Sequence, residues 1–157
     1  MNGRGLDDRN KRSDVINWLK QKMSDIYILQ ETHTSQQSTQ VWENEWGYKG
    51  IFSSHTSKSR GVAILFRNTF EFKINKTIIH DEGRYVIVDI TISNTRLTLV
   101  ALYGPNDDTP NFFSLLQAQI ETIANSSKII VGDWNVVQDY DKDTKNYKGK
   151  NNPKSKQ

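Results

Sequence analysis

The sequence lacks cysteine entirely, which excludes disulfide bonds and thiolate metal ligands and fits an intracellular protein. Its three histidines, His33, His55 and His80, are widely separated and do not have the spacing of a metal-binding motif, although His33 lies close to an acidic residue. No apolar run approaches the ~20 residues of a membrane span, so we expect no membrane-crossing segment. The first five residues contain no apolar core of the kind found in signal peptides.

Three familiar catalytic signatures are also absent: the glycine-rich phosphate loop, the Gly-X-Ser-X-Gly motif and the His-Glu-X-X-His motif. Because no residue is a candidate for a covalent nucleophile, metal-assisted hydrolysis is the class of enzyme that remains. The net charge of +3 permits an anionic partner such as nucleic acid without requiring one. A chain of 157 residues is one domain or part of one.

Hydrophobic periodicity predicts an alternation of helices and strands. We predict helices over residues 8–23, 34–46 and 110–124. Residues 48–103 are predicted to be all-β, with a hairpin turn at Ser93-Asn94. Further strands are predicted at residues 26–31 and 128–131. This order is typical of a layered α/β fold in which helices cover at least one sheet, and a site is expected where strand ends gather.

The segment Gly132-Asp133-Trp134-Asn135 follows the apolar run at residues 128–131. An apolar run rich in β-branched residues that ends at glycine is typical of a buried strand. Side chains two residues apart on an extended chain point the same way, so Asp133 and Asn135 are expected to converge on one reacting group. The alternative is that both side chains cap a turn after the strand.

A second apolar run, at residues 26–30, ends at the acidic residue Glu31. Glu31 is either a strand-end carboxylate paired with a nearby cation or a ligand for Mg²⁺, which binds one or two carboxylates and retains several waters. Tyr103 ends another strand, either as a half-buried aromatic or as a phenol that contacts a phosphate. Asn106 is a turn residue or a substrate contact. Strands that end in acidic residues indicate a site at one sheet edge.

Five short motifs occur in the order found in a known family. They are Asn2-Gly3-Arg4-Gly5-Leu6, Leu29-Gln30-Glu31-Thr32-His33, Gly61-Val62-Ala63-Ile64-Leu65, Leu102-Tyr103-Gly104-Pro105-Asn106 and Gly132-Asp133-Trp134-Asn135. Together they resemble the endonuclease/exonuclease/phosphatase superfamily, and within it the apurinic-type endonuclease domain of non-LTR (LINE-type) retrotransposon polyproteins. The strings Gln-Glu-Thr-His and Tyr-Gly-Pro-Asn are the most specific. The similarity extends from residue 2 to about residue 151.

The resemblance implies a four-layer α/β sandwich, with two mixed sheets face to face and helices outside. It also implies hydrolysis of phosphodiesters with Mg²⁺ or Mn²⁺. In the retrotransposon branch the domain nicks one strand of target DNA, and the freed 3′-hydroxyl primes reverse transcription. By this resemblance Glu31 is a metal ligand, and Asn2 helps to hold the metal or the nucleophile.

Four further residues receive roles from the same resemblance. Asp133 activates or orients the attacking water, and Asn135 steadies the phosphate. Tyr103 contacts the scissile phosphate, and Asn106 lies close to the DNA. The expected partner is therefore DNA, with no membrane involved, and we expect a monomer that acts in the nucleus.

The family pattern is incomplete at both ends of this sequence. The family has a core strand before the position of Asn2, and a further Asn or Asp followed by a Ser-Asp-His motif after the position of Asn135. We therefore expect a sandwich without its N-terminal strand and part of its second sheet, from a retrotransposon reading frame with a reverse transcriptase domain downstream. Loss of a histidine acid/base lowers a rate about 10²–10⁴-fold, so weak or no activity is expected.

Composition divides the chain into two parts. Residues 1–137 are expected to form the partial domain, and residues 138–157 a polar tail rich in lysine and asparagine. We expect the tail to be poorly ordered, because such a composition does not offset the entropy of ordering. Two other functions stay open: a non-catalytic remnant that binds nucleic acid, and a phosphatase-type member of the same superfamily.

Overall fold

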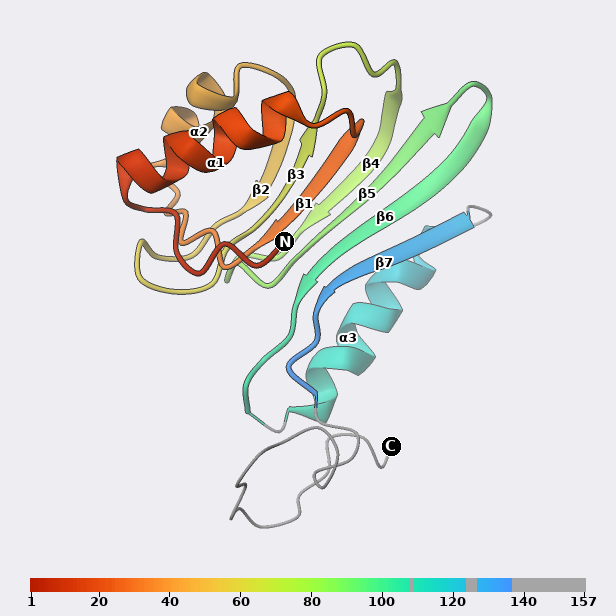
Figure 1. Ribbon diagram of the computed structural model, residues 1–157. Coiled ribbons are helices and arrows are strands. Elements are labelled where there is room, and N and C mark those ends of the chain that lie inside the picture. The colour runs from red at the N-terminus through yellow and green to blue at the C-terminus, as the bar shows by residue number, and fades with distance from the viewer. Residues whose placement is uncertain (108, 124–126, 137–157) are drawn as a thin grey trace, which may run out of the picture.

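A computed structural model describes residues 1–107, 109–123 and 127–136 (Figure 1). The described elements in chain order are α1 (Arg9–Gln21), β1 (Ile26–Gln30), α2 (Thr39–Trp46), β2 (Gly50–Ser53), β3 (Val62–Phe66), β4 (Lys73–Ile79), β5 (Tyr85–Ile92), β6 (Thr95–Tyr103), α3 (Pro110–Glu121) and β7 (Ser127–Asp133). The tail expected at residues 138–157 and the boundary at residue 137 lie outside the described residues. None of the described helices is long and apolar enough to cross a membrane.

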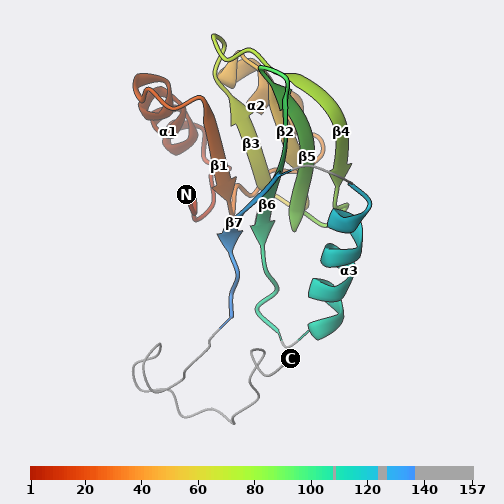
Figure 2. The same ribbon diagram turned by 90° about the vertical axis from the view of Figure 1, so that its right-hand side faces the viewer.

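Two sheets lie face to face, with helices on both outer faces (Figures 1 and 2). The first sheet has the antiparallel order β1-β3-β2, and the second has the order β4-β5-β6-β7, in which only β7 pairs in parallel. Helices α1 and α2 cover the first sheet, and α3 covers the second. The order of layers is therefore helix, sheet, sheet, helix, which confirms the expected α/β sandwich.

Strand alternation explains how the layers hold together. On β3, Val62, Ile64 and Phe66 face the space between the sheets, whereas Ala63 and Leu65 face α1 and α2. Strand β5 repeats the pattern, with one face between the sheets and the other against α3. Both strands are buried on both sides and mostly apolar; the buried exception on β5 is Asp89, which pairs with Arg96 of β6. The two strands form the rigid centre from which the strand ends project.

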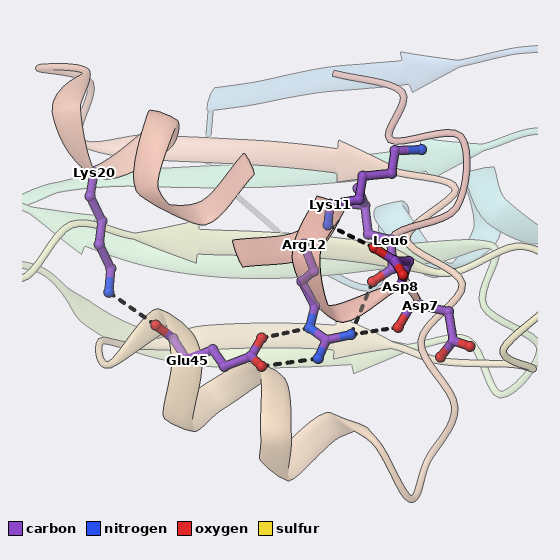
Figure 3. A network of polar contacts seen from close by, with 7 residues as sticks. All are labelled: Leu6, Asp7, Asp8, Lys11, Arg12, Lys20 and Glu45. Carbon is purple, nitrogen blue, oxygen red and sulfur yellow. Dashed lines mark hydrogen bonds and ion pairs between the residues drawn. The ribbon is translucent and has the colours of Figure 1, made fainter. Parts of the chain in front are cut away.

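A bidentate ion pair joins the two helices on the first sheet (Figure 3). The guanidinium of Arg12 on α1 donates from Nε and Nη2 to the Glu45 carboxylate on α2, at 2.5 and 2.9 Å. Lys20 adds a hydrogen bond from Nζ to the Glu45 carbonyl at 3.0 Å. This network holds α2 against α1, whereas apolar packing holds both helices against the sheet.

The short helix expected within residues 34–46 is α2, which ends before Gly47. It begins at Thr39, because the Ser35 and Ser38 side chains bind nearby backbone groups and hold residues 35–38 in a turn. Within residues 48–103, predicted to be all-β, Phe70 and Phe72 lie in a segment that precedes β4 and is not a strand. There Phe72 stacks on Phe66 of the inner core, with ring centroids 4.1 Å apart.

The prediction of a buried strand at residues 128–131 is wrong. Ile129, Ile130 and Val131 are 47%, 40% and 40% exposed, respectively. Among the described residues, β7 pairs only with β6, so it lies at an edge of the second sheet. A parallel strand is buried only when neighbours flank it and layers cover both faces. The apolar run correctly indicated a strand but not its position in the sheet.

Candidate active site

The polar residues singled out in the sequence gather where β1, β6 and β7 end. Strands β6 and β7 pair in parallel, and their register places Leu97 opposite Ser127 and Tyr103 opposite Asp133. The final residues of the two strands therefore lie side by side. At the end of β1, in the other sheet, Glu31 receives a hydrogen bond of 2.6 Å from the Tyr103 hydroxyl. This bond connects the two sheets at the candidate site.

Glu31 leaves β1 in an unusual backbone conformation. Its φ of 51° lies in the left-handed region, as does the φ of 55° at His33. Non-glycine residues adopt this region at a cost, and they do so where the surrounding structure holds them. The segment is held by its backbone: the Glu31 carbonyl accepts from Gly5 at 2.9 Å, and the His33 N–H donates to Arg60 at 2.8 Å. The strained turn points the Glu31 carboxylate toward Tyr103.

Asp133 is held by two asparagines. Its Oδ2 accepts from Asn2 Nδ2 at 3.1 Å, and its Oδ1 accepts from the Asn135 backbone N–H at 3.3 Å. Asn2 Oδ1 also accepts from the Arg4 N–H at 2.9 Å, so the Asn2 side chain has a fixed orientation. The Asn2 amide therefore orients Asp133, and its oxygen retains a second lone pair for a metal or water.

The route by which Asp133 and Asn135 meet differs from the prediction. The chain is not extended at Asn135, whose φ is 50°. The Asp133 carboxylate caps this turn, as the alternative interpretation of the sequence had it. Both residues nevertheless line one pocket, together with Asn2 and Asn106. Capping the turn occupies one carboxylate oxygen in part and leaves lone pairs for chemistry.

Gly104 joins the ends of β6 and β7. Its N–H donates to the Asp133 carbonyl at 2.7 Å, and its carbonyl accepts from Asn135 Nδ2 at 2.8 Å and from Arg84 Nη1 at 3.0 Å. A Cβ atom at this position would lie 2.1 Å from the Trp134 carbonyl oxygen. Only glycine allows this close approach, which holds both strand ends in place.

The Tyr103 phenol remains protonated at neutral pH. Burial raises its pKa, and the hydrogen bond that it donates to Glu31 raises the pKa further. Its ionised form would also be repelled by the carboxylates of Glu31 and Asp133. Tyr103 is therefore a hydrogen-bond donor at this site and not a base.

Two pockets share Asn106. The first, of about 750 Å³, is lined by residues including Asn2, Asp133 and Asn135, and the second, of about 440 Å³, by residues including Glu31 and Tyr103. All six candidate residues therefore belong to one continuous region at the strand ends. His33 lines the second pocket, whereas His80 packs between Tyr85 and Phe112.

The second pocket also contains cations that the sequence did not reveal as site residues: Lys58, Arg60 and Arg84. Arg84 lies 5.5 Å above the Tyr103 ring, and no carboxylate forms an ion pair with it in the described part of the chain. Its pKa is lowered by burial and by the charge of Arg60. The register of the hairpin could have identified Arg84 as a site residue. Strands β5 and β6 run antiparallel, and their pairing brings residue 84 beside residue 103.

The donor set fits a hard divalent cation. The polar groups at the strand ends are the carboxylates of Glu31 and Asp133 and the amide oxygen of Asn2, and oxygen ligands with few carboxylates suit Mg²⁺ and Mn²⁺. Within residues 1–107, 109–123 and 127–136, no three acidic, histidine or cysteine side chains cluster as a closed metal cage. The site would therefore leave coordination positions to water and substrate.

The sequence matches the model of the Endonuclease/Exonuclease/phosphatase family over residues 1–151. The chain belongs to this family. A transposon protein of Xenopus laevis, the Transposon TX1 uncharacterized 149 kDa protein, is 28% identical over 142 residues, which cover 88% of this chain and 11% of that protein. The family resemblance is therefore confirmed, and this relative agrees with the retrotransposon branch.

Solved structures of the family have the same fold. The AP endonuclease LMAP of Leishmania major matches with a TM-score of 0.62 and 18% identity, over 89% of this chain and 55% of that one. The endonuclease domain of TRAS1, a telomere-specific non-LTR retrotransposon, matches with a TM-score of 0.63 and 13% identity, over 87% of this chain and 59% of that one. This chain thus spans little more than half of either structure.

Proposed function

We propose that the chain forms the core of a metal-dependent phosphodiesterase that nicks DNA, with weak activity by itself. The observation that carries the proposal is the 2.6 Å hydrogen bond from Tyr103 to Glu31, which joins two sheets where Asp133 and its asparagine partners lie. Two carboxylates, a protonated phenol and amide groups at one edge match the needs of phosphodiester hydrolysis. The family and the endonuclease neighbours support this chemistry.

Each residue has a role in this proposal. Glu31 and Asn2 would hold the divalent cation that family members generally require, and the bound cation would neutralise charge on the phosphate. Asp133, oriented by Asn2, accepts a proton from the attacking water and aligns it. The single hydroxyl proton of Tyr103 is donated to Glu31 in the free protein, so Tyr103 donates to a phosphate oxygen only when Glu31 releases it to bind the cation. Asn135 is held in place by a hydrogen bond from its Nδ2 to a backbone carbonyl, and the same amide would donate to a phosphate oxygen, where a positioned donor stabilises the charge that develops in the transition state.

Nucleic acid is the proposed substrate because of the charge of the second pocket. Lys58, Arg60 and Arg84 line this pocket beside the carboxylates of Glu31 and Asp107. Arg60 also pairs with Glu82 at 2.8 Å. Such cations bind consecutive phosphates of a strand, and Asn106 is placed to contact the same strand. In the parent retroelement, the nick would supply a primer for a downstream reverse transcriptase domain, and the protein would act in the nucleus.

The test is conversion of supercoiled plasmid to the nicked form in Mg²⁺. We expect slow nicking that is abolished by EDTA and by Glu31→Gln. Glu71→Gln is the matched control, because Glu71 is an exposed acid away from both pockets. Nicking that survives Glu31→Gln would show that this site is not responsible.

A second candidate function is binding of nucleic acid without cleavage. It is favoured by the three cations of the second pocket and by the lack of a histidine among the described residues that line the pocket of Asp133. DNA binding that weakens with salt, without nicking at any Mg²⁺ concentration, would support it. A third possibility is a phosphatase that acts on phosphate monoesters. A rate of p-nitrophenyl phosphate hydrolysis that equals or exceeds the rate of plasmid nicking would support it.

A further inference from the structure

The side chain of Gln30, the last residue of β1, has no role in the proposed mechanism. It is 3% exposed, and its amide nitrogen Nε2 has no hydrogen-bond partner in the part of the chain that the structure describes. Native proteins pair nearly all such buried donors, because an unpaired one loses its interaction with water and gains nothing. This donor therefore requires an explanation.

The position of Gln30 is fixed by its backbone. Its N–H donates to the Met1 carbonyl at 3.0 Å, and its carbonyl accepts from the Gly3 N–H at 2.7 Å. On the other side it pairs with Val62 of β3. These contacts fix the backbone of Gln30 and therefore the face of the strand on which its side chain lies.

Gln30 lies in the wall of the first pocket, with its side chain on the face of β1 that is turned toward the other sheet. It alternates with Ile26 and Ile28, whose side chains pack between the two sheets, and it lines the pocket that also contains Asp133. The next residue, Glu31, has a left-handed backbone and lines the second pocket with Tyr103. Two consecutive residues thus serve the two halves of the site.

We propose that Gln30 is a substrate-contacting residue whose Nε2 donates a hydrogen bond to a non-bridging oxygen of the phosphodiester. The inference rests on the proposed function and adds to its site. An N–H group is matched by an oxygen acceptor and not by a cation, so a metal is not its direct partner. The non-bridging phosphate oxygens are anionic acceptors that would enter beside Asp133, and hydrogen bonds to charged groups are the stronger ones.

The alternative is that Gln30 stabilises the fold. The two roles predict opposite effects of a Gln30 substitution on the stability of the free protein. If Nε2 is unpaired in the free protein, Gln30→Met removes an unpaired donor at similar length and leaves the free protein at least as stable. If Gln30 supports the fold, the same change destabilises it. Gln117→Met is the matched control, because Gln117 is exposed on α3 and bonds only Glu121 on its own helix.

The experiment compares the full 157-residue chain with these variants. The melting temperature is measured without DNA, and the Kd for a 20-base-pair duplex is measured in EDTA and in Mg²⁺, beside the plasmid-nicking rate. We expect Gln30→Met to melt at or above the wild-type temperature and to bind the duplex about 10-fold more weakly. Gln30→Glu, which replaces the donor with a carboxylate, should bind more weakly still, and Gln117→Met should match wild type.

The results separate the inference from the proposed function. A Gln30→Met protein that fails to fold, melts lower than Gln117→Met, or binds DNA as wild type does would overturn the role of Gln30. Wild-type protein that binds but does not nick would refute the proposed function, while the Kd comparison would still decide the role of Gln30. If the wild-type protein does not bind the duplex, both the proposed function and the role of Gln30 are refuted.

Discussion

The Arg12–Glu45 pair allows a sharp prediction about stability (Figure 3). Arg12 is only 6% exposed, and its guanidinium also donates to the carbonyls of Leu6 and Asp7 at 3.2 and 2.8 Å. It lies 5.7 Å from the centre of the Trp42 ring. The substitution Glu45→Ala would remove the only carboxylate that pairs with Arg12 in the described part of the chain and leave a buried charge.

The magnitude follows from what remains around Arg12. Removal of one partner from a buried ion pair destabilises a protein by about 3–5 kcal/mol. The two carbonyls and the Trp42 ring still contact the guanidinium, so we expect the lower end, about 3 kcal/mol. Replacement of both partners in Arg12→Met/Glu45→Leu removes the unpaired charge and should recover most of this loss. The single and double variants together isolate the ion pair from helix propensity.

Urea denaturation of the chain, followed by tryptophan fluorescence, measures these differences. The matched control is Glu43→Ala on the same helix, since Glu43 forms no ion pair among the described residues, and it should change stability by less than about 0.5 kcal/mol. A loss for Glu45→Ala no larger than that for Glu43→Ala would refute the reasoning.

The same ion pair gives a pH dependence. The hydrogen bonds from Arg12 lower the pKa of Glu45, despite the opposing effect of burial. The resulting stability is fully present above the unfolded pKa of a glutamate, about 4.3, and is lost as the pH falls through the lower folded pKa. We expect the difference between wild type and Glu45→Ala to shrink over that acidic range. A difference that stays constant down to pH 2 would contradict the assignment.

Three other substitutions test the site and the sheet edge. Gly104→Ala should abolish nicking and lower the melting temperature, because its Cβ would lie 2.1 Å from the Trp134 carbonyl oxygen. Arg84→Gln should reduce the slope of log Kd for DNA against log salt by about 1, whereas Lys73→Gln, on the far edge of the second sheet, should not. Ile130→Lys, on the exposed edge strand β7, should reduce aggregation measured by light scattering, and unchanged aggregation would argue against that edge as its cause.

Much of the fold was predictable because local patterns and tertiary packing agree. The apolar segment at β3 and the alternation along β5 predict strands, and the structure places both strands at the centre of the sandwich. The turn at Ser93-Asn94 sets the register of β5 and β6. In that register, the Tyr103 hydroxyl reaches Glu31, a residue that the family resemblance assigns to the same site.

The errors occur where burial depends on neighbours that a local pattern does not encode. Strand β7 has the composition of a central strand but occupies an edge among the described residues. Arg84 precedes a strand and was overlooked, since strand starts and strand ends meet only after antiparallel pairing. Gln30 was taken as part of a motif, yet only the structure shows its buried amide without a partner.

The sequence by itself determined the residue types available for chemistry. The sequence has no cysteine and its histidines are scattered, so oxygen atoms are the ligands available for a metal. The motifs around Glu31, Tyr103 and Asp133 identify the family. Only the tertiary structure decided how these residues meet. The Tyr103–Glu31 and Asn2–Asp133 hydrogen bonds join atoms 72 and 131 residues apart in the chain, and such contacts depend on sheet pairing and packing of the layers. Local sequence encodes strands and turns, whereas the site arises from their long-range arrangement.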